Sequence, residues 1–131
     1  MTRERVPAIV IGGGVVGLAV ARALVHRPDT PIFDEPSSGL DFAASFDYLA
    51  RVRALAREGC SSIIVTHHLD EIPPEVERVV VLDQGTIAAD GPKASVLVPE
   101  LLSRVYGTAV AVAVVDGHFL AYPAEADAPK R

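Results

Sequence analysis

Several residue types that would point to particular protein classes are scarce in this chain of 131 residues. A single cysteine, Cys60, excludes an internal disulfide. No apolar run reaches the roughly 18 residues that a membrane-spanning helix needs, and the first residues lack a secretory signal pattern. The net charge is −5 and no basic stripe occurs, which argues against a nucleic-acid partner. We therefore expect a cytoplasmic chain without direct membrane insertion, which would reach the inner face of the cell membrane only through a partner.

Two site signatures are also absent. No Gly-x-x-x-x-Gly-Lys-Ser/Thr loop, whose backbone holds phosphates in many ATPases, occurs in the chain. The cysteine and histidine residues do not have the spacing of a zinc site, and no role is assigned to His68. Nucleotide binding would therefore need a different phosphate-binding element.

The composition is typical of helices packed on a buried parallel sheet. Half of the residues are hydrophobic but only 5% are aromatic, so Val, Ala, Leu and Ile form the core. Apolar patterns predict strands over 6–11, 31–34, 61–66, 78–83, 86–90, 109–115 and 118–122. They predict helices over 15–25 and 43–58, with short helical segments over 69–72, 93–97 and 100–106.

The order of these elements predicts the fold class. Strands and helices alternate in the first part, which indicates an α/β fold with a mostly parallel sheet flanked by helices. This would be one half of a P-loop NTPase-like or Rossmann-like domain. Asp116-Gly117 favours a tight hairpin turn, so a small antiparallel hairpin is expected near the C-terminal end. Residues 1–131 would form one domain, and residues 124–131 a flexible tail.

Two adjacent carboxylates, Asp34 and Glu35, follow the second predicted strand. Ligands of open α/β sheets bind outside the carboxyl ends of the strands. Carboxylate oxygens suit Mg²⁺, and a neighbouring carboxylate can polarise a water molecule for attack on a phosphate. His67 follows the next strand, where its imidazole could contact a phosphate oxygen.

These residues carry a family resemblance. The run 31–36, with Asp34 and Glu35, resembles the Walker B strand of ATP-binding-cassette (ABC) transporter ATPases. Ser38-Gly39-Leu40-Asp41 is similar to their D-loop, Thr66-His67 to their switch histidine, and residues 80–92 to the strand–turn–strand that follows it. The match extends over about residues 21–116, the C-terminal half of an ATP-binding subunit.

The resemblance implies an ATP site that also binds Mg²⁺. Asp34 would be the metal-associated acid, Glu35 the catalytic base and His67 the switch residue, while Ser38 and Asp41 would contribute through the D-loop. The implied partners are a transporter membrane subunit and a second nucleotide-binding subunit, and the implied function is to couple ATP binding and hydrolysis to transport.

The chain departs from this family pattern near its start. The Walker A loop and the Q-loop segment are missing. The signature loop retains Gly12 and Gly13 but has Ile11 and Gly14 in place of the family's Ser and Gln. We therefore interpret the chain as a truncated or rearranged ABC ATPase with little activity of its own, and a non-functional or purely interacting remnant is a further alternative.

A second motif competes for the same segment. Gly12, Gly14 and Gly17 form a Gly-x-Gly-x-x-Gly pattern between a predicted strand and helix, and Glu35 stands where an acid would bind a ribose. Residues 1–35 therefore resemble the dinucleotide-binding βαβ segment of FAD-dependent oxidoreductases. The alternative hypothesis is a small Rossmann-like module that binds FAD or NAD through Gly12, Gly14, Gly17 and Glu35.

Overall fold

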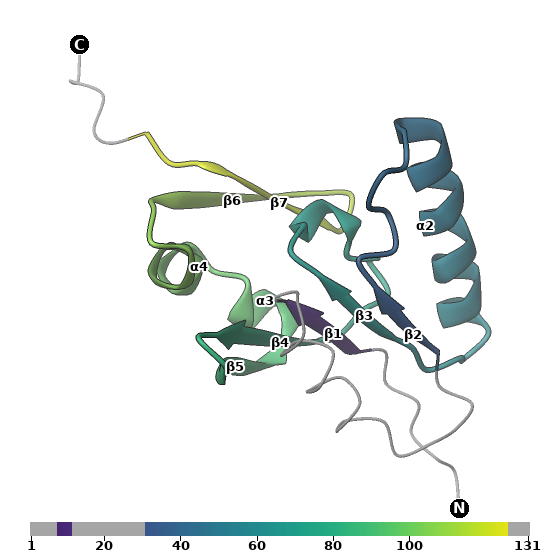
Figure 1. Cartoon of the computed structure of the whole chain (residues 1–131), viewed down its shortest axis with the longest axis horizontal. Helices are drawn as coiled ribbons and strands as arrows, with labels where there is room; N and C mark the ends of the chain where they lie inside the picture. Colours follow the sequence, from purple (N-terminus) through teal and green to yellow (C-terminus); the bar gives the residue numbers. More distant parts are fainter. Residues whose placement is uncertain (1–7, 12–30, 126–131) are drawn as a thin grey trace, which may run out of the picture.

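A five-stranded sheet forms the centre of the molecule in a computed structural model that describes residues 8–11 and 31–125 (Figure 1). The strand order is β2-β3-β1-β4-β5. The strands are β1 (Ala8–Ile11), β2 (Ile32–Asp34), β3 (Ile63–Thr66), β4 (Arg78–Asp83) and β5 (Thr86–Pro92). The β2–β3, β3–β1 and β1–β4 pairs are parallel, and the β4–β5 pair is antiparallel. The predicted α/β class is confirmed.

Within the described residues, four helical segments accompany the sheet: α2 (Phe42–Arg57), the 3-10 turn η1 (Leu69–Glu71), α3 (Lys93–Val96) and α4 (Pro99–Tyr106). Helix α2 begins where expected because the carboxylate of Asp41 accepts a hydrogen bond from the Ala44 N–H, a typical N-cap. It ends before Gly59, whose φ of +79° suits a residue just past a helix. The glycines at 12, 13, 14 and 17, the expected helix over 15–25 and residues 126–131 lie outside the described residues.

The amphipathic pattern of α2 corresponds only partly to its burial. Val52 is buried against the sheet core, but Phe42 is 84% exposed and Phe46 is 65% exposed. These two rings stack on each other, with centroids 6.1 Å apart. The spacing of apolar residues identified the helix, but such spacing indicates one face of a helix and not whether another element covers that face.

Both faces of the sheet carry buried side chains. On one face, Ile64, Val79 and Val81 pack with α2 and with residues of α3 and α4. On the other, Ile63 and Val65 pack with Val80 and Leu82. Alternate residues of β3 and β4 therefore enter opposite cores, as a strand buried on both faces requires.

The last two strands, β6 (Val110–Val115) and β7 (His118–Pro123), pair with each other as an antiparallel hairpin outside the main sheet. The turn residues Asp116 and Gly117 have φ values of 50° and 81°, which two-residue hairpin turns of the predicted kind need. In Figure 1 the hairpin extends across the molecule above β4 and next to η1. No helix among the described residues is both long and apolar enough to cross a membrane.

Candidate functional site

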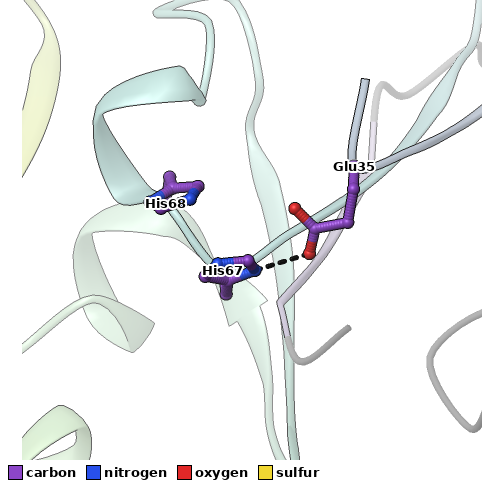
Figure 2. Close-up of side chains that lie close together, drawn as sticks. All are labelled: Glu35, His67 and His68. Atoms are coloured by element: carbon purple, nitrogen blue, oxygen red, sulfur yellow. Dashed lines mark hydrogen bonds and ion pairs between the residues drawn. The ribbon is translucent and has the colours of Figure 1, made fainter. Parts of the chain in front are cut away.

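The candidate site lies where β2 and β3 end side by side. The two strands are parallel, with Asp34 opposite Val65. The residues that follow each strand therefore leave the sheet at the same edge. This geometry brings together the side chains of Glu35 and His67, to which the family resemblance assigns the roles of catalytic base and switch residue (Figure 2).

Glu35 is fixed by an unusual backbone conformation. Its φ is +48°, a value uncommon for residues other than glycine. Its N–H donates a 2.8 Å hydrogen bond to the carbonyl of Val65, which ties the first residue after β2 to the end of β3. Backbone of this kind persists where surrounding contacts hold it, and it concentrates at functional sites.

The side chains of Glu35 and His67 are in direct contact. Nδ1 of His67 lies 2.6 Å from Oε1 of Glu35 (Figure 2). When the Glu35 carboxylate is ionised it only accepts hydrogen bonds, and the hydrogen bond then requires a proton on Nδ1. The second ring nitrogen, Nε2, is then the atom available to another group. His67 is 55% exposed and Glu35 is 24% exposed, so the pair is open to solvent on one side.

A third carboxylate, Glu71 of η1, accepts hydrogen bonds from residues near the ends of both strands. This residue was not predicted from the sequence. Its Oε2 accepts a 3.0 Å hydrogen bond from the Thr66 hydroxyl, and its Oε1 accepts a hydrogen bond from the Ser37 hydroxyl. Glu71 thereby connects the loop after β2 to the end of β3. Nothing in the spacing of the sequence indicated this residue, because its partners lie on segments that meet only in the folded chain.

Tyr48 of α2 lies close to this carboxylate. Burial, and secondarily the negative charge of Glu71, raise the pKa of the Tyr48 phenol to about 12. Its hydroxyl is buried and has no hydrogen-bond partner within the described ranges. Its ring meets Phe33 of β2 edge to face, with centroids 6.0 Å apart. Aromatic side chains of β2 and α2 therefore pack next to Glu71.

The other predicted residues lie nearby with different contacts. Asp34 is exposed at the end of β2, a position that fits a carboxylate ligand of Mg²⁺. Ser38 is exposed in the loop, and Asp41 is the N-cap of α2. No hydrogen bond or ion pair between these three side chains and the Glu35–His67 pair occurs in the part of the chain that the structure describes.

The structure adds His68 to the site. Its ring lies against that of His67, with centroids 4.0 Å apart. Glu35, His67 and His68 each offer one ligand atom within 4.8 Å of the others. The spacing of residues along the sequence did not indicate this cluster, because its members come from the ends of two different strands.

A cavity of about 710 Å³ begins at the two histidines. One side is formed by His67, His68 and η1, and the other by residues of the β6–β7 hairpin, among them Leu120 and Tyr122. Most of this lining is apolar. The predicted C-terminal hairpin therefore forms one wall of a cavity at the candidate site.

Comparison with known proteins identifies clear relatives, although no protein-family model matches the chain. The chain is 41% identical over 101 residues to the hemin import ATP-binding protein HmuV of Rhodococcus jostii (strain RHA1), covering 77% of this chain and 35% of that protein. It is 42% identical over 95 residues to the molybdenum import ATP-binding protein ModC of Mycobacterium tuberculosis, covering 72% and 26%. It is 43% identical over 90 residues to the octopine permease ATP-binding protein P of Rhizobium radiobacter, covering 69% and 34%.

A solved structure supports the same fold. An inward-facing ABC transporter described as the metal-chelate type superposes with a TM-score of 0.58 at 20% identity, over 72% of this chain and 38% of that one. The chain spans about a third of the length of the curated relatives it matches. These comparisons lend no support to the flavin resemblance. The homologues of this chain are ATP-binding subunits of ABC transporters.

Proposed function

We propose that this chain contributes to ATP binding and hydrolysis in an ABC transporter, which couples them to transport. Its part would be the Walker B, D-loop and switch-histidine segments of an ATP site. The observation that carries the proposal is the 2.6 Å contact between Glu35 and His67 at adjacent strand ends. These are the two residues that the family resemblance assigns to the catalytic base and the switch.

The residues at this edge suit Mg-ATP. Asp34 is exposed at the end of β2 and would hold Mg²⁺, which neutralises phosphate charge when it is bound. Glu35 would orient and polarise the attacking water. Its hydrogen bond leaves Nε2 of His67 free to face a phosphate oxygen. Catalysis of this kind depends on positioning and electrostatics, which the fixed backbone of Glu35 provides.

The glycine residues after β1 would supply the contacts to phosphate. Strand β1 lies between β3 and β4, and Ile11 at its end is level with Thr66. Gly12, Gly13 and Gly14 follow Ile11 directly in the sequence, and Gly17 lies three residues further on. Backbone N–H groups of a glycine-rich turn can bind phosphates without a lysine, though less strongly than a complete phosphate loop.

A complete ATP site would need further protein segments and partner subunits around this one. The sheet would be one portion of a mostly parallel P-loop NTPase-like sheet flanked by helices. Ser38 and Asp41 would face a second nucleotide-binding subunit, and a membrane permease subunit would be the other partner. The chain would be cytoplasmic and peripheral on the inner face of the membrane. Hemin, molybdenum and octopine are named for its relatives, so the cargo of this chain would be a small solute of that general kind.

Calorimetric titration of the purified chain with Mg-ATP, and separately with FAD, tests the proposal. We expect binding of Mg-ATP, weakened by Asp34→Asn, and no binding of FAD. The matched control is Asp83→Asn, which changes a carboxylate at the end of β4. FAD binding without ATP binding would overturn the proposal and favour the dinucleotide module.

Hydrolysis provides a second test. Because the sequence has no Walker A lysine, we expect the chain alone to hydrolyse ATP slowly at most. Addition of a complete ATP-binding subunit from a related transporter should raise the rate, and Glu35→Gln should remove that increase while Glu77→Gln, at an exposed position, leaves it. Rapid hydrolysis by the chain alone that persists in Glu35→Gln would contradict the role of Glu35.

A further inference from the structure

We propose that Glu35, His67 and His68 form a binding site for a divalent transition-metal ion of the zinc class. Their ligand atoms lie within 4.8 Å of one another. Figure 2 shows the carboxylate of Glu35 pointing towards the imidazole of His67, with the ring of His68 on the other side of His67. The inference stands on these three side chains alone and does not require that the chain bind ATP.

The backbone places both histidine rings on the same side. Consecutive residues of an extended strand point to opposite faces, but the chain bends at His67, directly after β3. The Thr66 hydroxyl accepts a 3.1 Å hydrogen bond from the His68 N–H, which holds this bend. The rings consequently lie 4.0 Å apart, centroid to centroid. Two neighbouring imidazoles with this orientation can present nitrogen atoms to a single ion.

Glu35 is held in position independently. Its positive φ and the hydrogen bond from its N–H to Val65 direct the side chain towards His67. A carboxylate oxygen already lies 2.6 Å from Nδ1 of His67. An ion between these two atoms would replace that hydrogen bond. The third ligand is thus held by its own backbone conformation and by a backbone hydrogen bond, independently of the two histidines.

The ligand set favours zinc-class ions over Mg²⁺. Imidazole nitrogen binds zinc, copper and nickel ions well, whereas Mg²⁺ prefers carboxylate oxygen and water. Ligand atoms about 2.1 Å from a tetrahedral zinc ion lie roughly 3.4 Å apart. Modest side-chain rotations, with His67 moving away from Glu35 and His68 moving inward, would give this spacing. Both histidines are exposed, so these rotations meet little steric resistance.

The site would remain open on one side. His67 and His68 also line the cavity of about 710 Å³. Three protein ligands leave a zinc ion a position for water or a small ligand, as in open zinc sites. If the proposed ATP chemistry is correct, zinc binding would exclude it, because both uses need Glu35 and His67. A zinc-class ion would then inhibit hydrolysis.

Zinc binding by the purified 131-residue chain tests this inference. After treatment with a chelator, the chain is titrated with ZnCl₂ by calorimetry in the absence of nucleotide. We expect one site that excess Mg²⁺ does not displace. His68→Ala should weaken zinc binding by at least about tenfold, since even the loss of a residue supporting a ligand costs that much. Substitution with Co²⁺ should give the intense visible absorption of a tetrahedral ion, and that absorption should fall in His68→Ala.

The controls separate this site from other sources of binding. His118→Ala removes an imidazole of the hairpin that is not in the cluster and should leave zinc affinity unchanged. Far-ultraviolet circular dichroism confirms that each variant is folded. Absence of zinc binding by the folded chain, or equal zinc affinity in the wild type and His68→Ala, would overturn the inference. Because nucleotide is absent, failure to bind ATP in the separate titration would leave this result unaffected.

Discussion

The buried hydroxyl of Thr66 donates a 3.0 Å hydrogen bond to Oε2 of Glu71. Thr66 ends β3 with no exposed surface, and Glu71 lies five residues later in η1. The other oxygen of the same carboxylate accepts a hydrogen bond from Ser37 after β2. One side chain therefore links the two strand ends that present Glu35 and His67.

We expect Glu71→Ala to lower the free energy of unfolding by about 1–3 kcal/mol, because it leaves the buried Thr66 hydroxyl without its acceptor. Glu71→Gln retains an acceptor oxygen and should cost less. Urea denaturation at neutral pH measures both. Glu77→Ala, at an exposed position of the neighbouring segment, should change stability by no more than about 0.5 kcal/mol. Equal stability of Glu71→Ala and the wild type would show that this hydrogen bond is not important.

The edge of the sheet at which the site lies could be predicted from the sequence. Apolar runs followed by Asp34-Glu35 and by His67 identify strands that end in polar residues, and parallel strands share their carboxyl edge. The C-terminal hairpin turn could also be predicted, because Asp116-Gly117 is a dipeptide that tolerates the positive φ values of a tight turn. These features depend on local chemistry, which sequence patterns report.

The contacts that complete the site could not be predicted. Glu71 and His68 acquire their roles from a bend and a 3-10 turn that bring distant segments together. The exposure of Phe42 and Phe46 was also hidden, since the apolar spacing of α2 indicates one face of the helix but does not indicate what covers it. Such features depend on packing between segments that are far apart in the sequence, and local sequence patterns do not report that packing.

Asp90 and Arg78 form a bidentate ion pair between β5 and β4. The hydrogen bond from Arg78, together with its charge, holds the pKa of the Asp90 carboxyl below its usual value against the effect of burial. The side chains are 38% and 44% exposed, so solvent screens the pair. We expect Asp90→Asn to lower the free energy of unfolding at neutral pH by only about 0.5 kcal/mol.

The sign of the pH dependence follows from this lowered pKa. The folded state binds a proton at Asp90 less readily than the unfolded state, so the contribution is complete above about pH 4 and is lost as the pH falls further. Urea denaturation of Asp90→Asn and the wild type at pH 7 and at about pH 3 should give a difference that disappears at the lower pH. Asp47→Asn is the control, because Asp47 forms an ion pair with Arg51 on α2 that is more exposed than the Arg78–Asp90 pair. If the stability difference between the wild type and Asp90→Asn grew on acidification, the pKa of Asp90 could not be lowered in the folded state.

Tyr48→Phe should stabilise the protein. The Tyr48 hydroxyl is buried and has no hydrogen-bond partner among residues 8–11 and 31–125, so removing it relieves a desolvation cost while the edge-to-face contact with Phe33 remains. We expect the free energy of unfolding to rise by about 1 kcal/mol. Tyr106→Phe, at a ring that is 43% exposed, is the matched control and should have little effect. A loss of stability in Tyr48→Phe would mean that the hydroxyl is satisfied, for example by a buried water molecule.

Gly117 and Gly85 occupy equivalent turns with different surroundings. Their φ values are 81° and 79°, so an alanine at either position adopts a left-handed conformation that costs about 1–2 kcal/mol. A Cβ at Gly117 would also lie 3.0 Å from Cβ of Pro74, whereas a Cβ at Gly85 has nothing within 4 Å. We therefore expect Gly117→Ala to destabilise the protein more than Gly85→Ala in thermal denaturation. Equal losses would show that the β6–β7 turn can move away from Pro74, and hence that the hairpin wall of the cavity is not rigidly seated on the segment after η1.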